Sequence, residues 1–138
     1  MKPMPAATRR QALVAIAGAA AASTPAAAAD YRPRAFSPAD FELLAALAET
    51  ILPRTDTPGA IDAGVPAMLD EDAADSPALK RSLDAALKPF RKDRFARLDD
   101  EARIELMTRY MNDPGARGRA FRAIKDATVD RYYQTEAG

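Results

Sequence analysis

Apolar residues recur at intervals of three and four along most of the chain after residue 36, which is the spacing of one face of an α-helix. The clearest apolar stripes are Phe41, Leu44, Leu47, Ala48 and Ile51; Leu79, Leu83, Leu87 and Phe90; and Phe121, Ile124, Thr128 and Tyr132. Ile104, Met107 and Met111 predict one further helix, and we expect the methionines, Met68 included, to lie in the core. No stretch predicts a strand. The pattern predicts an all-α domain, a small irregular bundle of about four or five helices.

The starts of these helices carry capping residues. Each start is a serine or aspartate, in most cases followed by a proline at the first helical position, where its missing N–H costs nothing. These starts are Ser37-Pro38, Ser76-Pro77, Asp99 and Asp113-Pro114. Pro53 ends the first helix, and Val65-Pro66 opens a short helix through Leu69.

The segment from Arg54 to Gly64 combines prolines and glycines with short polar residues, which predicts a loop of defined turns. Prolines restrict φ, so the loop can present a preorganised surface to a partner at a low entropic cost. The alternative is a simple connection between two helices, in which Asp56 or Thr57 bonds local backbone amides.

The first 29 residues have the composition of a cleavable export signal. Lys2, Arg9 and Arg10 supply positive charge, an alanine-rich apolar stretch follows, and Ala27-Ala28-Ala29 predicts cleavage before residue 30. The run Thr8-Arg9-Arg10-Gln11-Ala12-Leu13 resembles a twin-arginine motif, in which the two guanidinium groups and Leu13 would be recognised. Ala27 and Ala29 would be the two small residues of the A-x-A site directly before the cleavage point. An ordinary secretory signal with two arginines is the alternative. We therefore expect a signal peptide (1–29), a linker (30–36) and a single helical domain (37–138), located in the periplasm.

Composition narrows the function of the remaining 109 residues. They hold 17 basic and 20 acidic side chains, because residues 1–29 contain three basic residues and no acid. A formal charge of −3 with both signs interspersed argues against nucleic-acid binding. The chain has no cysteine and no histidine, so it lacks the side chains that most often bind redox metals or transfer protons near neutral pH. We expect it not to be an enzyme.

Two further groups of residues have alternative interpretations. Asp70, Glu71, Asp72 and Asp75 lack the spacing of a calcium loop, and we expect them to form a solvated acidic helix face. Tyr132 and Tyr133 end the last predicted helix, where neighbouring side chains point about 100° apart. One tyrosine can therefore pack inward while the other serves as an interface anchor, or both rings cover the edge of the core.

Several segments together resemble one known family. They are Phe36-Ser37-Pro38-Ala39-Asp40-Phe41, Leu44-x-x-Leu47-Ala48-x-Thr50-Ile51-Leu52-Pro53, Thr55-Asp56-Thr57-Pro58-Gly59-Ala60, Ala63-Gly64-Val65-Pro66 and Lys125-x-x-Thr128-Val129-x-x-Tyr132-Tyr133. In these the chain resembles the gluconate 2-dehydrogenase subunit 3 family, small accessory subunits of periplasmic flavin-dependent sugar and polyol dehydrogenases.

The resemblance implies a role and a set of partners. The chain would carry the twin-arginine signal, bind and stabilise a large FAD-dependent dehydrogenase of the GMC type, and export it through the twin-arginine translocase. It would bind no cofactor itself, and a multihaem cytochrome c would complete a complex that can associate with the membrane. The expected partner interface comprises Pro53, Thr55, Asp56, Thr57, Pro58, Gly59, Gly64, Val65, Pro66, Tyr132 and Tyr133. A free-standing periplasmic helical binding or adaptor module is the alternative.

Overall fold

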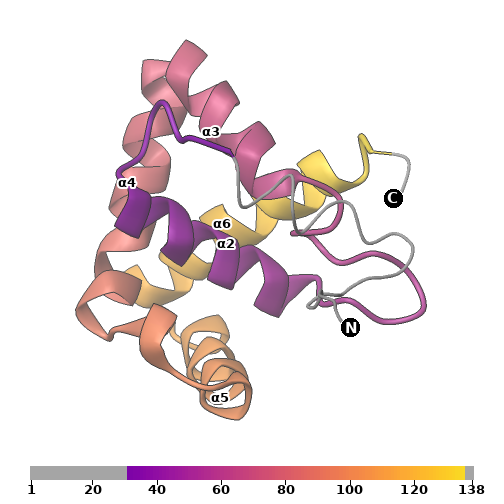
Figure 1. The fold of residues 1–138 in the computed structure, drawn as a ribbon. Coiled ribbons are helices and arrows are strands. Elements are labelled where there is room, and N and C mark those ends of the chain that lie inside the picture. Colours follow the sequence, from indigo (N-terminus) through magenta and orange to yellow (C-terminus); the bar gives the residue numbers. More distant parts are fainter. Residues whose placement is uncertain (1–30, 136–138) are drawn as a thin grey trace. The chain divides into compact units, whose positions relative to one another are not determined.

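The computed structural model describes residues 31–135, and within that range it contains five α-helices, one short 3₁₀ helix and no strand (Figure 1). The elements are α2 (Pro38–Ile51), α3 (Val65–Asp75), α4 (Pro77–Lys92), η1 (Phe95–Arg97), α5 (Asp100–Met111) and α6 (Ala116–Tyr132). All of them belong to one compact unit, Arg32–Gly138. The predicted all-α fold is confirmed. None of the helices in the described range is long and apolar enough to cross a membrane.

The predicted caps form at three of the helix starts. The Ser37 hydroxyl accepts the N–H of Asp40 (3.1 Å), and the Ser76 hydroxyl accepts the N–H of Leu79 (3.2 Å). The carboxylate of Asp99 accepts the N–H of Ala102 at 2.8 Å. Each bond satisfies one of the N–H groups that a helix leaves without an internal partner.

The predicted start of the last helix was wrong by two residues. Asp113 accepts the N–H of Gly115 at 2.6 Å and so closes a tight turn instead of capping a helix. Pro114 therefore lies in this turn, and α6 begins at Ala116. An aspartate that bonds the amide two residues on competes directly with the cap geometry.

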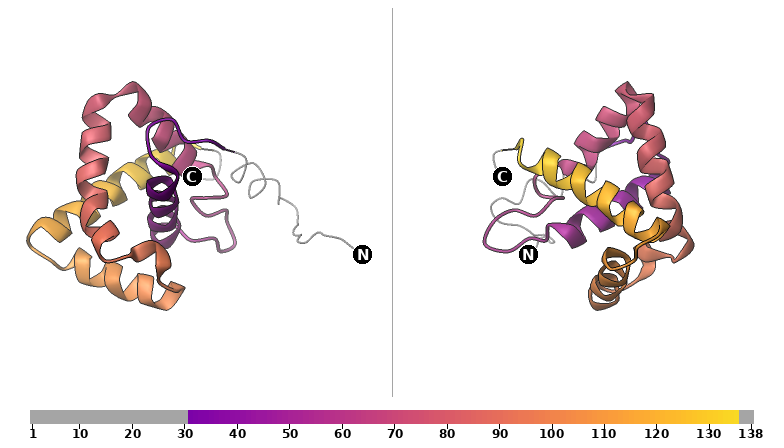
Figure 2. Two further views of the ribbon diagram at one scale, coloured as in Figure 1. Left: turned by 60° about the vertical axis from the view of Figure 1, so that its left-hand side comes forward. Right: turned by 180° about the vertical axis from the view of Figure 1, so that it is seen from behind.

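The core lies where α6 crosses the other helices. Figure 1 shows α6 crossing behind α2, and the reverse view in Figure 2 shows it in front, while α3, α4 and α5 also pack against it. The largest fully buried side chains include Leu44 and Leu47 of α2, Leu83, Leu87 and Phe90 of α4, Phe95 of η1, Tyr110 of α5 and Ile124 of α6. Burying a side chain of this size stabilises the fold by about 1.5–3 kcal/mol. The predicted stripes of α2, α4 and α6 thus supply the core.

Two apolar residues of α5 do not enter the core. Ile104 is 59% exposed and Met111 is 50% exposed, so the expectation that Met111 is buried was wrong. The buried side chains of α5 are Leu106, Met107 and Tyr110. Ile104 is two residues before Leu106, which turns it about 200° around the helix and away from α6. Met68 is half-buried and Met107 is buried.

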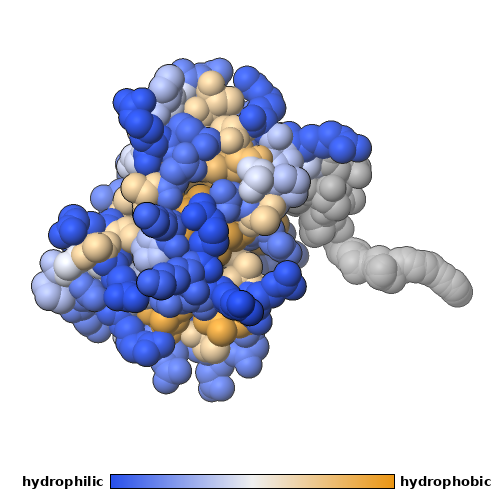
Figure 3. Space-filling model, turned by 90° about the vertical axis from the view of Figure 1, so that its left-hand side faces the viewer, coloured by the Kyte–Doolittle hydropathy of each residue, from blue (hydrophilic) through white to orange (hydrophobic). Residues whose placement is uncertain are grey.

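The side of the domain on which α4 lies is largely hydrophilic. In the space-filling view of this side, the apolar areas are small and separated by polar residues (Figure 3). The outward positions of α4 carry charge, with Arg81, Lys88 and Lys92 exposed. This face therefore presents no large apolar area to a partner.

Candidate docking surface

The loop between α2 and α3 is held together by one carboxylate from the last turn of α2. Glu49 accepts the N–H of Arg54 at 3.0 Å and the N–H of Ile61 at 2.9 Å, which joins the two sides of the loop. The N–H of Ala60 also donates to the carbonyl of Leu52 at 2.8 Å. Burial raises the pKa of Glu49 above its ordinary value, although the two N–H groups act in the opposite direction. Glu49 therefore holds the two sides of the loop together.

Two glycines make this close folding of the loop possible. A side-chain carbon on Gly59 would lie 2.6 Å from the backbone nitrogen of Arg54, so only glycine fits there. Gly64, directly before α3, has a φ of 80°, a left-handed conformation that favours glycine. Asp62 accepts the N–H of Gly59 at 3.3 Å and lies 3.4 Å from the guanidinium of Arg54. Glu49 and Asp62 thus bind the loop amides, a role that the alternative interpretation of the loop gave to Asp56 or Thr57.

The two segments expected at the partner interface meet in the structure. The hydroxyl of Tyr132, at the end of α6, donates to the carbonyl oxygen of Pro58 at 2.7 Å, across 74 positions of sequence. Tyr132 is 7% exposed, whereas Tyr133 is 65% exposed and packs edge-on against the Tyr132 ring, with centroids 5.7 Å apart. One tyrosine therefore anchors the loop, and its neighbour faces the solvent.

An open groove of about 710 Å³ lies between the loop and the residues that follow α6. Its lining comprises Thr57, Pro58, Asp62, Ala63, Met68, Gln134 and Thr135. We call this groove, the exposed residues 53–58 and Tyr133 the docking surface. Of the residues expected at the interface, Pro53, Thr55, Asp56, Thr57 and Pro58 are exposed, Gly64 is half-buried, and Gly59, Val65, Pro66 and Tyr132 are buried. The buried members support this surface from below and cannot form most of its contact area.

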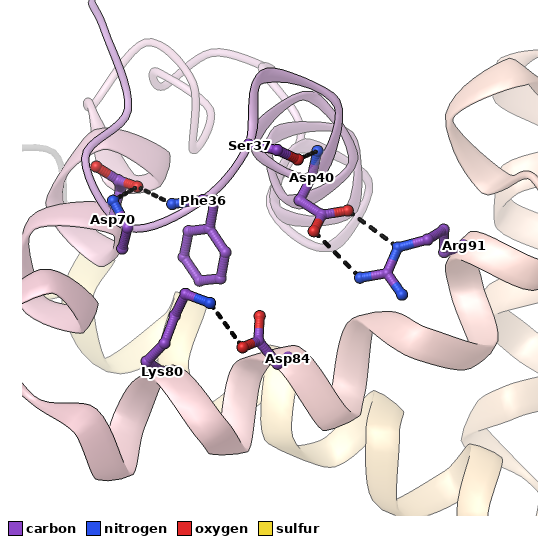
Figure 4. Close-up of polar contacts among 8 residues, drawn as sticks. Phe36, Ser37, Asp40, Asp70, Lys80, Asp84 and Arg91 are labelled. Carbon is purple, nitrogen blue, oxygen red and sulfur yellow. Dashed lines mark hydrogen bonds and ion pairs between the residues drawn. The ribbon is translucent and has the colours of Figure 1, made fainter.

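Asp70 contradicts the expected solvated acidic face. It has no exposed surface, and its carboxylate accepts three successive backbone N–H groups, from Arg34 (2.7 Å), Ala35 (3.0 Å) and Phe36 (3.0 Å). Figure 4 shows the carboxylate of Asp70 directed at this segment. A buried carboxylate is tolerated where backbone donors replace its water, and here they do. Asp70 therefore fastens residues 34–36, which lie directly before α2, to α3.

The other acidic residues of α3 do lie toward solvent. Glu71 and Asp75 are exposed, and Asp72 is half-buried. In the described part of the chain, no group of three or more aspartates or glutamates is arranged to hold a metal ion.

A second hollow, of about 480 Å³, lies beside Tyr110 and is also lined by Asp93, Arg109 and Arg117. Tyr110 is 1% exposed, stacks on Phe90 and donates its hydroxyl to Asp93 at 2.6 Å. Burial and the Asp93 carboxylate raise the pKa of Tyr110 to about 12. The bond from Tyr110 to Asp93, the residue directly after α4, joins α5 to the end of α4.

Comparison with known proteins gives one match. The family model for gluconate 2-dehydrogenase subunit 3 matches residues 38–138, which include the loop, the groove and both terminal tyrosines. No curated protein and no solved structure matches the chain. The predicted export residues Arg9, Arg10, Leu13, Ala27 and Ala29 precede the matched range and lie outside the described residues. Since the match spans nearly the whole helical domain, the chain belongs to the gluconate 2-dehydrogenase subunit 3 family.

Proposed function

We propose that this chain is the non-catalytic small subunit of a periplasmic flavin-dependent dehydrogenase and that it escorts the large subunit through the twin-arginine translocase. Family membership supports the role of an accessory subunit of a gluconate dehydrogenase complex. The twin-arginine run at Arg9-Arg10 supports the export role. In this proposal FAD is bound by the large subunit, a GMC-type dehydrogenase, and a multihaem cytochrome c is a further subunit of the complex.

The observation that carries the proposal is the bond between Tyr132 and the carbonyl of Pro58. It brings two segments that are 74 positions apart into one surface with an open groove. Tyr133 is left exposed beside them, and tyrosine is a frequent anchor at protein interfaces because it brings a large area with few rotatable bonds. Glu49 already joins the two sides of the loop, which lowers the entropic cost of ordering the loop on binding.

The export role can be tested by conservative substitution in the signal. Arg9→Lys with Arg10→Lys keeps the charge but removes both planar guanidinium groups, and it should leave this chain and the large subunit in the cytoplasm. The matched control is Arg119→Lys with Arg122→Lys, which alters two exposed arginines of α6 and should not affect export. Cell fractionation followed by immunoblotting of both subunits gives the answer. Normal export of the large subunit with the lysine pair at positions 9 and 10 would contradict the escort role.

A further inference from the structure

Helix α3 connects the docking surface with the segment that leads into the domain. Three residues, spaced two apart, make these connections. Met68 lines the docking groove, and Asp70 binds the backbone of residues 34–36. Asp72 forms an ion pair of 3.1 Å with Arg131, the residue next to Tyr132. Helix α3, with 11 residues, therefore contacts both the docking groove and the segment 34–36.

The segment 34–36 is also attached through one ion pair and through the core, where Phe36 is buried and Ala35 packs against the core residues. Arg34 lies 3.7 Å from Asp75, but both side chains are more than half exposed, so this ion pair contributes little. Phe36 is 5% exposed and packs below the ammonium group of Lys80, 5.1 Å from its ring centre. Three hydrogen bonds from the backbone of 34–36 to Asp70 and the burial of the Phe36 ring therefore hold this segment, and a shift of α3 would weaken the three bonds together.

Helix α3 packs its buried face against α2, α4 and α6, and it is also attached to the loop and to the end of α6 by polar contacts. The N–H of Val65, the first residue of α3, donates to the carbonyl of Ala60 in the loop at 3.0 Å. At the other side of the loop, Pro58 accepts the bond from Tyr132, and Arg131 pairs with Asp72 of α3. A contact that stabilises the loop against α6 therefore adds to the attachments that hold α3 in place.

We propose that α3 couples partner docking to the attachment of residues 34–36, so that a bound large subunit reduces the local release of this segment from Asp70. The inference rests on the proposed function, because it takes the large subunit as the ligand of the docking surface. The two states are a segment bound to Asp70 and a segment released from it. Coupling of this kind is reciprocal, so loss of the Asp70 bonds weakens docking by the same factor by which docking strengthens them. The attachment of the segment that follows the export signal would then report whether cargo is bound.

The coupling is tested first without any partner, by amide hydrogen exchange on the full chain. Tyr132→Phe removes the hydroxyl that joins the end of α6 to Pro58 in the loop and should speed exchange at residues 34–36 by about two- to tenfold. The matched control is Tyr110→Phe, which removes the hydroxyl that bonds Asp93 near α5. This control should leave exchange at residues 34–36 unchanged. Equal exchange at these residues in wild type and Tyr132→Phe, or equal acceleration in both variants, would overturn the coupling.

A second arm uses the complex with the large subunit, isolated through a tag on this chain. Docking should slow exchange at residues 34–36 by roughly 5- to 150-fold relative to the chain alone, while α5 exchanges at an unchanged rate. If the large subunit is bound and exchange at 34–36 does not change, the coupling is refuted and the proposed function stands. If no large subunit copurifies, the proposed function fails, and the Tyr132→Phe experiment alone decides whether α3 links the two structures.

Discussion

Replacing Asp70 with asparagine should lower the free energy of unfolding by about 3 kcal/mol. The carboxylate oxygen Oδ1 accepts two N–H groups, and Oδ2 accepts the third, from Arg34, at 2.7 Å. Asparagine can place its carbonyl at the first position, but its NH₂ group then faces the N–H of Arg34. One bond to a charged acceptor, worth about 1.5–3 kcal/mol, is lost, and two others become neutral bonds worth about 0.5–1.5 kcal/mol. A lower desolvation cost for the neutral amide offsets part of this loss.

Urea unfolding of the full chain, followed by circular dichroism at the helical minimum, measures this loss. With a urea dependence of about 1–3 kcal/mol per molar, a loss of this size moves the midpoint by about 1–3 M. Domains of this size have about 5–15 kcal/mol of stability in total, so the change is a large fraction of it. The variant should unfold at clearly lower urea while keeping its helical content in dilute buffer.

Asp75→Asn supplies the matched control, because Asp75 lies on the same helix and near the same arginine. Its side chain is 78% exposed, and its distance to Arg34 is 3.7 Å, so we expect no measurable loss of stability. A difference between the Asp70 and Asp75 variants of less than about 0.5 kcal/mol would refute the reasoning, since it would mean that the three N–H bonds to Asp70 are replaced by water at no cost.

Three further predictions address the surface, the core and the pH dependence. Tyr133→Ala should weaken binding of the large subunit at least about tenfold in a titration, yet leave the urea midpoint unchanged, because this ring is largely exposed. Thr128→Val should raise the free energy of unfolding by about 1 kcal/mol in urea, since the buried Thr128 hydroxyl has no hydrogen-bond partner among residues 31–135; a destabilised variant would contradict this. Because the pKa of Tyr110 is raised to about 12 from an unfolded value near 10, its protonated form stabilises the fold below pH 10, and this stability is lost as pH rises from 10 to 12. The difference in urea midpoint between wild type and Tyr110→Phe should therefore be smaller at pH 11 than at pH 9. An equal difference at both pH values would refute this assignment.

Local features of the sequence were sufficient to predict most of the helices. Caps such as Ser37 and Ser76 depend on bonds that span three residues, and the apolar stripes of α4 and α6 are regular enough to define their buried faces. Asp113 is the exception, because it closes a turn instead of capping α6. The residue type suits both a cap and a tight turn, and the local sequence did not decide between them.

Asp70 could not be predicted in the same way, because its partners lie 34 to 36 positions earlier in the chain. Within the run Asp70-Glu71-Asp72 it looks like part of a charged outer face. One signal was present: Asp70 lies four residues after Pro66 and three before Ala73, and both belong to the buried stripe of α3. Following that stripe strictly would have placed this carboxylate inside.

The candidate interface was predicted from residue types. The structure shows which of its residues are exposed and can contact a partner, and which are buried beneath the surface. Sequence reasoning allowed that one of Tyr132 and Tyr133 points inward, and the bond to Pro58 identifies Tyr132. The role of Glu49 in fixing the loop was missed, since its two bonds depend on how the loop returns to α2.

Purification of the C-terminally tagged chain from the periplasm tests the central claim most directly. The eluate is examined by visible absorption and by gel electrophoresis. We expect a yellow eluate with flavin absorbance and a larger copurifying subunit, as required of the small subunit of a flavin-dependent dehydrogenase. A colourless eluate that contains only the monomeric chain would contradict this account and favour a free-standing helical binding module.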